Sequence, residues 1–149
     1  MKFFFALLLM VLPAQGEDTC SRYYELDSKL QCGSNGYLQQ FAIPYCEEYL
    51  ERSSEFSSRS QEILQNIRQC LQNELVIKEN LSCSNIAKIG VQSHYGCYLQ
   101  SGFCDMEPKD QMLVIWIARE QVFNWPVFDV FLRVQRACLA SSINRARQR

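Results

Sequence analysis

The cysteines constrain this chain more than any other feature. There are eight, at Cys20, Cys32, Cys46, Cys70, Cys83, Cys97, Cys104 and Cys138. An even number in a short chain that carries an export signal indicates a disulfide framework. A zinc site would need cysteine and histidine pairs at short spacing. No two cysteines here are closer than Cys97 and Cys104, and the one histidine is His94. We therefore expect no metal site and no cofactor.

The first sixteen residues have the pattern of a secretory signal peptide. Lys2 is followed by the apolar run Phe3 to Leu12, which is too short to cross a bilayer, and Ala14-Gln15-Gly16 is a small-x-small cleavage site. This predicts a signal peptide over 1–16, a mature start at Glu17, and a secreted, extracellular protein with no membrane insertion. Residues 17–149 are expected to form a single domain. The formal net charge is only −1, so no nucleic-acid partner is expected.

Apolar periodicity predicts four to five helices. The first begins at Pro44, because proline suits the first helical turn. The second follows a capping-box pattern made by Ser58 and Gln61. Its apolar stripe consists of Ile63, Leu64, Ile67, Cys70, Leu71 and Leu75. The third runs from near Ser84 to Leu99, although Gly90 and Gly96 weaken it.

Two further segments follow in the C-terminal third. Pro108 opens the first, in which Met112 to Ala118 is apolar all round and fits a buried helix or a buried strand. Asn124 caps the last helix, with Pro126 at its first position. Its stripe is Val127, Val130, Phe131, Val134 and Cys138. We expect Trp116 and Phe131 to lie in the core.

The segment before Pro44 is expected to be irregular, because Cys32-Gly-Ser-Asn-Gly36 reads as a turn. The segment from Cys20 to Tyr37 would then lie over the helices. The fold class predicted from the sequence is therefore all-α, stapled by disulfides, with an irregular N-terminal segment.

No catalytic set emerges from the sequence. The run His94-Tyr-Gly-Cys-Tyr98 resembles one in secreted phospholipases, which also need an aspartate paired with the histidine and a glycine-rich calcium loop. No aspartate follows His94, and Gly102-Phe-Cys104 is not such a loop. One histidine among many serines does not define a triad. All eight cysteines can pair, which argues against a cysteine nucleophile. We expect a protein that is not an enzyme.

One N-glycosylation sequon is present, Asn80-Leu81-Ser82, between two predicted helices. A sequon in an exposed loop of a secreted chain is an acceptor for glycan. We therefore expect Asn80 to be glycosylated.

The cysteine spacing resembles that of the stanniocalcin family. Cys46 to Cys70 spans 24 positions, Cys83 to Cys97 spans 14, and Cys97 to Cys104 spans 7. The sequence around the cysteines is also similar, at Tyr45-Cys-Glu-Glu-Tyr-Leu50, at Phe56, and at Cys97-Tyr98 followed by Cys104. The resemblance covers residues 44–139.

The resemblance implies a disulfide pairing and a function. The implied pairs are Cys20–Cys46, Cys32–Cys83, Cys70–Cys97 and Cys104–Cys138. The implied function is that of a hormone-like glycoprotein that binds an extracellular or cell-surface partner and regulates calcium and phosphate homeostasis. The alternative is a secreted helical lipid-binding or defence protein.

The chain also departs from the family. It lacks the family's extra N-terminal disulfide, its long C-terminal tail and the cysteine that joins two subunits. Any homodimer is therefore expected to be non-covalent, with Phe128 and Leu132 as candidate contacts.

Overall fold

The computed structural model describes residues 19–121 and 123–148. This part of the chain contains six α-helices and no strand, so the predicted all-α class is confirmed. The helices are α1 (Ser21–Leu30), α2 (Ile43–Glu51), α3 (Ser58–Val76), α4 (Ile86–Gln100), α5 (Pro108–Ile117) and α6 (Trp125–Arg147). Short turns connect them: η1 (Leu38–Ala42), η2 (Ser53–Glu55), η3 (Phe103–Asp105) and η4 (Arg119–Gln121). The predicted signal peptide and the start at Glu17 lie outside the described residues.

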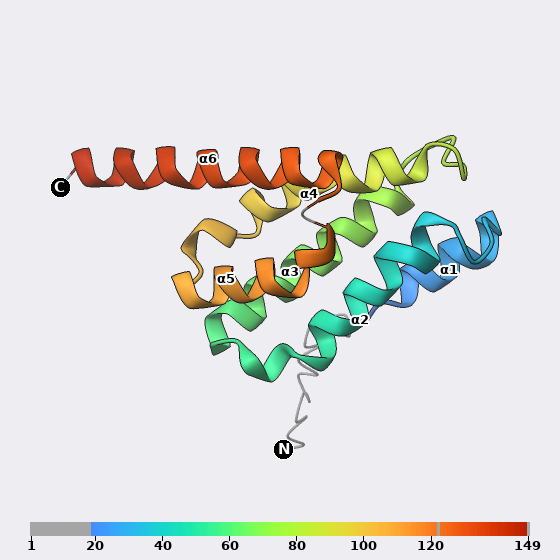
Figure 1. Ribbon diagram of the computed structural model, residues 1–149, viewed down its shortest axis with the longest axis horizontal. Coiled ribbons are helices and arrows are strands. Elements are labelled where there is room, and N and C mark those ends of the chain that lie inside the picture. The colour runs from blue at the N-terminus through green and yellow to red at the C-terminus, as the bar shows by residue number, and fades with distance from the viewer. Residues whose placement is uncertain (1–18, 122, 149) are drawn as a thin grey trace, which may run out of the picture.

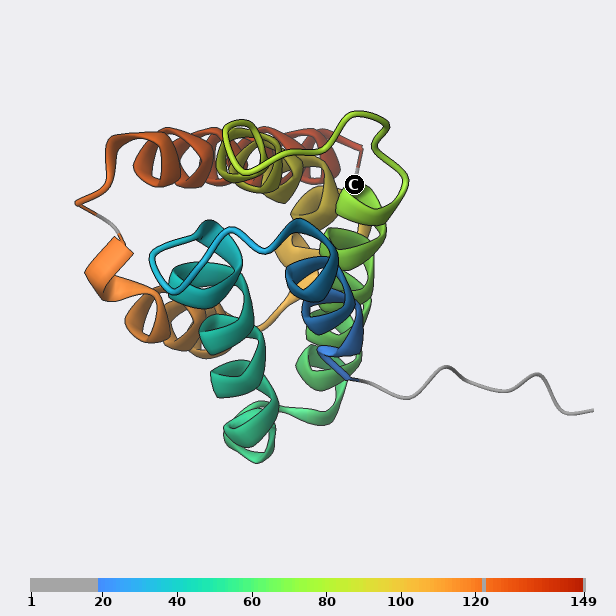
Figure 2. The ribbon, with the colours of Figure 1, turned by 90° about the vertical axis from the view of Figure 1, so that its right-hand side faces the viewer.

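Helix α4 is central, because it packs against both α3 and α6. In Figures 1 and 2, α6 lies along α4 and α1 lies beside α3, and in Figure 2 α2 lies between α1 and α5. The last turns of α6 project past α4 (Figure 1), and residues 139–148 are exposed. No helix in the described ranges is long and apolar enough to cross a membrane.

Two buried apolar clusters form the core. The larger joins α3, α5 and α6 through Ile63, Leu64, Val114, Ile117 and Val134, with Phe56 and Phe103 from the connections. The smaller joins α1, η1 and α2 to the end of α3 and the start of α4, through residues that include Leu26, Leu38, Ile43, Leu75 and Ile86. The predicted stripes of α3 and α6 therefore face the core, at Ile63, Leu64, Ile67 and Leu75 and at Val130, Val134 and Cys138.

Four disulfides tie these helices together, and they use all eight cysteines. The pairs are Cys20–Cys46, Cys32–Cys83, Cys70–Cys97 and Cys104–Cys138, the pairing that the resemblance implies. Cys70–Cys97 joins α3 to α4, and Cys104–Cys138 joins η3 to α6. Cys32–Cys83 instead joins two connecting loops.

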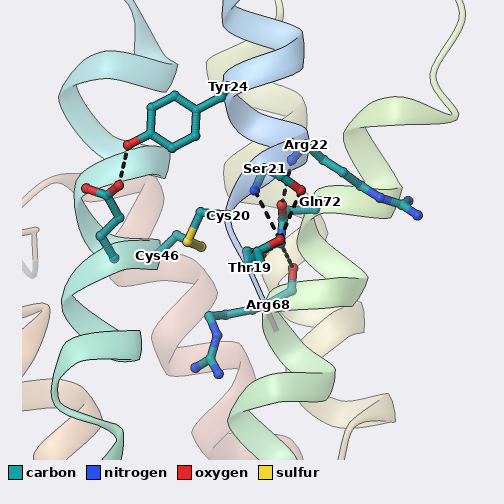
Figure 3. Close-up of a disulfide and its surroundings, with 9 residues drawn as sticks. Thr19, Cys20, Ser21, Arg22, Tyr24, Cys46, Arg68 and Gln72 are labelled. Carbon is teal, nitrogen blue, oxygen red and sulfur yellow. Dashed lines mark hydrogen bonds between the residues drawn. A yellow bond between two sulfur atoms is a disulfide. The ribbon is translucent and has the colours of Figure 1, made fainter. Parts of the chain in front are cut away.

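The prediction of an irregular segment from Cys20 to Tyr37 is wrong over most of its length, because Ser21–Leu30 form α1. Helix α1 is held by a buried glutamine of α3 that the sequence did not single out. Gln72 accepts a hydrogen bond from the Arg22 backbone N–H at 3.2 Å and donates one to the Thr19 carbonyl at 2.8 Å. Figure 3 shows Gln72 facing these groups, next to the Cys20–Cys46 disulfide. These long-range contacts add to the burial of Tyr23 and Leu26 in stabilising a helix of only ten residues.

The helix was expected to begin at Pro44, but helical structure begins earlier, at the segment that leads into α2. Residues Leu38–Ala42 form one π-helical turn, closed by the Ile43 N–H donating to the Leu38 carbonyl. Proline lacks an N–H and crowds the carbonyl four residues before it. The wider π turn places Pro44 in the first turn of α2 without breaking the path, and π turns are frequent at functional sites.

The predicted capping box at Ser58 and Gln61 is also wrong. Ser57 is the N-cap of α3, and Gln61 Nε2 donates to the Phe56 carbonyl at 2.9 Å. The orphan N–H of Ser57 is satisfied by Asp110 of α5, whose Oδ2 lies 3.2 Å from Ser57 N and 2.6 Å from Ser57 Oγ. This carboxylate is only 1% exposed, and it joins the starts of α3 and α5.

Candidate functional site

His94, the one titratable side chain of catalytic type that the sequence singled out, lies among aromatic rings. Its ring is 6.2 Å from that of Phe41 and 5.8 Å from that of Tyr98. Nδ1 lies 2.7 Å from the Gly90 carbonyl, which can only accept, so the ring proton is on Nδ1. Burial lowers the pKa of His94, and the hydrogen bond to Gly90 offsets this only in part. The imidazole is therefore neutral at physiological pH and acts as a packing group within α4.

No metal-ligating cluster of three or more histidine, cysteine, aspartate or glutamate side chains lies within residues 19–121 and 123–148. Asp110 is a buried carboxylate in the first turn of α5. Burial by itself would raise the pKa of Asp110, but the hydrogen bonds from Ser57 and Ser60 outweigh it and the net shift is downward. Asp110 is thus a charged structural group at two helix starts.

His94 borders a small apolar pocket between α4, α5 and α6. The pocket has a volume of about 80 Å³. Its lining is almost wholly apolar: Phe41, Val91, His94, Tyr98, Phe103, Val114, Ile115, Ala118, Val127, Phe128, Val130, Phe131 and Val134. Phe131, expected in the core, is half-buried and forms part of this lining. We call this space the inner pocket.

A wider groove of about 590 Å³ adjoins the inner pocket. The two share four lining residues, Phe41, Val91, Val127 and Val130, which form their common border. The other groove residues are mostly polar or charged and include Gln40, Lys88, Gln92, Gln121, Asn124, Asp129 and Arg133. We call this space the outer groove. It lies between η1, α4 and the first turns of α6.

Several large apolar side chains are exposed along α5, in the connection that follows it and at the first residue of α6. Met112 is 62% exposed, Trp116 60%, Phe123 94% and Trp125 70%. We call these four the exposed apolar set. The prediction that Trp116 lies in the core is therefore wrong. Val114 and Ile117 face the core instead, and Trp116 turns outward, where the Arg119 guanidinium lies 4.7 Å from its ring.

This error has a clear physical source. Six consecutive apolar residues, Met112 to Ile117, give α5 no apolar stripe, so periodicity could not select the buried face. Asp110 and Tyr49 select it. The Asp110 carboxylate binds Ser57, and the buried Tyr49 hydroxyl donates to the Val114 carbonyl at 2.9 Å. These two contacts fix the rotation of α5 against α3 and α2.

The sequon lies in the connection between α3 and α4. Asn80 is exposed and has a positive φ of 61°. Asn85, the N-cap of α4, donates to the Asn80 carbonyl at 3.0 Å and accepts from the Ser82 N–H at 2.8 Å. The Asn85 side chain thus fixes the backbone of the loop, while the Asn80 side chain stays exposed to solvent.

Comparison with known proteins adds no assignment: no protein-family model, no curated protein and no solved structure matches the chain. The features that the fold supports are therefore the exposed apolar set, the paired inner pocket and outer groove, and the exposed sequon. The four disulfides fit an extracellular protein.

Proposed function

We propose that this protein is a secreted, hormone-like glycoprotein that acts by binding an extracellular or cell-surface protein partner and not by catalysis. The observation that carries the proposal is the exposed apolar set, in which two tryptophans are more than half exposed. Tryptophan is enriched among the residues that contribute most to protein interfaces. Met112 and Trp116 lie one turn apart on α5, Phe123 lies in the connection and Trp125 begins α6. Four large apolar side chains within fourteen residues exceed the scattered exposure usual on a surface.

The surroundings of this set fit a protein interface. Lys109 and Glu107 form an exposed ion pair at the start of α5, and Arg119 stacks on Trp116. Charged groups around central aromatic side chains are the usual arrangement of an interface core and rim. Asp110 and the Cys104–Cys138 disulfide hold α5 and α6 in place, so the three members on these helices, Met112, Trp116 and Trp125, are preorganised for binding.

The resemblance to stanniocalcins supplies the process, namely calcium and phosphate handling by target cells. The experiment adds purified, glycosylated protein to epithelial cells of the source species and measures saturable surface binding of the labelled protein together with calcium and phosphate uptake. We expect saturable binding and a change in uptake. Trp116→Ala with Trp125→Ala should weaken the binding at least tenfold.

The matched control is Val76→Ala with Ile77→Ala, which removes two exposed apolar side chains at the end of α3. This pair should bind as the wild type does. Equal binding by the two double variants would overturn the assignment of the surface. Binding without any change in ion uptake would overturn the proposed process but not the proposed surface.

The alternative, a lipid-binding or defence protein, has one observation in its favour, the inner pocket. Its volume of about 80 Å³ is well below the several hundred Å³ that enclose a drug-sized ligand. The inner pocket by itself cannot enclose a whole lipid molecule, so this function stays second.

A further inference from the structure

We infer that the outer groove and inner pocket form one binding site for an amphipathic anion with a single hydrocarbon chain. The chain would enter the inner pocket and the anionic head group would lie in the outer groove. The proposal goes beyond the proposed function and does not depend on it, because no member of the exposed apolar set lines either space.

The first argument is the contrast in polarity between the two spaces. All but one of the inner-pocket side chains are apolar or aromatic, and the exception, His94, is neutral. The outer groove adds four amide and three charged side chains to the apolar border that the two spaces share. An apolar end joined to a polar end matches a ligand that is itself apolar at one end and polar at the other.

The second argument is size. A dry apolar cavity of about 150 Å³ can hold benzene, so the inner pocket, at about 80 Å³, accepts only a short stretch of hydrocarbon. The outer groove is several times larger, at about 590 Å³. Together the two reach the usual range for ligand sites, about 300–1,000 Å³. The ligand must therefore occupy both spaces, which excludes a purely apolar molecule confined to the pocket.

The third argument is charge. Two cations, Lys88 and Arg133, line the outer groove against one carboxylate, Asp129. Arg133 Nη1 is 3.9 Å from Asp129 Oδ2, a long ion pair, and its guanidinium lies 4.4 Å from the Tyr95 ring. Lys88 is exposed and forms no ion pair with any described residue. The groove thus has a surplus positive charge, and this favours a carboxylate or phosphate head group.

The fourth argument is the arrangement of the border. Phe41 lines both spaces and comes from the π turn η1, while Val91 belongs to α4 and Val127 to α6. The Cys70–Cys97 and Cys104–Cys138 disulfides fix α4 and α6, so the border is present before any ligand arrives. A preformed border lowers the ordering cost of binding.

The first test uses the wild-type protein with its disulfides intact. Calorimetric titration compares decanoate, decyl phosphate, decanol and decyltrimethylammonium, and methyl NMR locates the binding. We expect both anions to bind at least tenfold more tightly than decanol or the cation, with shifts at Val91, Val127 and Val130. Affinity should rise by up to about fourfold for each added methylene until the chain fills the inner pocket, and then level off. Tighter binding of decyl phosphate would support the site and assign a phosphate head group, and tighter binding of decanoate a carboxylate.

The second test uses two variants, each with a matched control. Lys88→Glu should weaken decanoate binding about tenfold and leave decanol binding unchanged. Lys29→Glu, an equal change on α1, should have no effect. Ala118→Phe fills the inner pocket and should abolish binding, while Ala140→Phe on the exposed end of α6 should not. Circular dichroism checks that each variant is folded.

The proposal is overturned by three results. One is the absence of heat and of methyl shifts with both anions. Another is equal affinity for the anions and the cation. The third is wild-type binding by folded Ala118→Phe. If Ala118→Phe does not fold, the Lys88→Glu comparison and the wild-type head-group series still decide the question.

Discussion

The hydroxyl of Tyr37 occupies the space where residue 90 would carry a Cβ atom. A Cβ on residue 90 would lie 2.6 Å from Tyr37 Cζ and closer still to Tyr37 Oη. Gly90 therefore admits the aromatic ring against the backbone of α4, at the edge of the outer groove. The glycine that appeared to weaken this helix in the sequence is needed for the contact between α4 and the segment before η1.

Gly90→Ala should destabilise the fold by about 1–3 kcal/mol, the usual cost of forcing an extra methyl into a packed site. Gly96→Ala on the same helix should instead stabilise it by about 0.5–1 kcal/mol, because the nearest atom to its Cβ is Gln100 Nε2 at 3.8 Å. Denaturant unfolding measures both. In a double-mutant cycle, Tyr37→Ala should remove most of the cost of Gly90→Ala. If Gly90→Ala and Gly96→Ala changed the free energy of unfolding equally, the close contact between Gly90 and Tyr37 would be contradicted.

Replacing Cys70 and Cys97 together by alanine should cost more stability than replacing Cys32 and Cys83. In the chain-entropy model the Cys70–Cys97 disulfide, with a separation of 27 residues, stabilises the fold by about 3.5 kcal/mol. The Cys32–Cys83 disulfide, with a separation of 51 residues, stabilises it by about 4 kcal/mol. Cys97, however, is 1% exposed, so its loss also leaves a void between α3 and α4. Cys83 is exposed. Urea unfolding of the two double variants gives the order, and a larger loss for the loop bridge would contradict it.

Asp110 should make stability depend on pH in the acid range. Its folded pKa is below the ordinary value, so its contribution is fully present above the pKa of the unfolded chain and is lost as the pH falls through the folded pKa. Asp110→Asn should cost about 2 kcal/mol at neutral pH, since it removes the charge from a buried hydrogen-bonded site. The difference from the wild type should shrink as the pH falls through the folded pKa of Asp110.

Chemical denaturation at a series of pH values from 2 to 7 measures this difference. Glu62→Gln, at an exposed position of α3, is the control and should change stability little at any pH. A difference between Asp110→Asn and the wild type that does not change with pH would show that the carboxylate charge plays no part.

Asn80 should carry an N-linked glycan when the full chain is made in a eukaryotic secretory host. The acceptor is exposed on a loop whose backbone is fixed by hydrogen bonds with the Asn85 side chain. Asn80→Gln and Ser82→Ala should each remove the mass shift, and peptide N-glycosidase should remove it from the wild type. Asn66→Gln, at an exposed position outside any sequon, should leave it in place. A persistent shift in both sequon variants would place the modification elsewhere.

The sequence by itself determined much of the local structure and the disulfide framework. The periodic stripes of α3 and α6 placed Ile63, Ile67, Val130 and Val134 in the core, because a face that recurs every three to four residues can be read without tertiary information. The start of α6 was predicted to within one residue for a similarly local reason: Asn124 is at the N-cap, although its side chain makes no capping hydrogen bond, and Pro126 is the second residue of the helix where the first was expected.

Only the tertiary structure decided which side chains contact one another across helices and which residues line the inner pocket and the outer groove. Helix α1 depends on Gln72, which is 50 residues away from Arg22, and no local signal predicts that contact. The outward turn of Trp116 depends on how α5 is anchored, since six consecutive apolar residues offer no preferred face. The inner pocket and the outer groove bring η1, α4, α5 and α6 together. Such a border depends on side chains distant in sequence, and packing together with the disulfides sets their mutual distances.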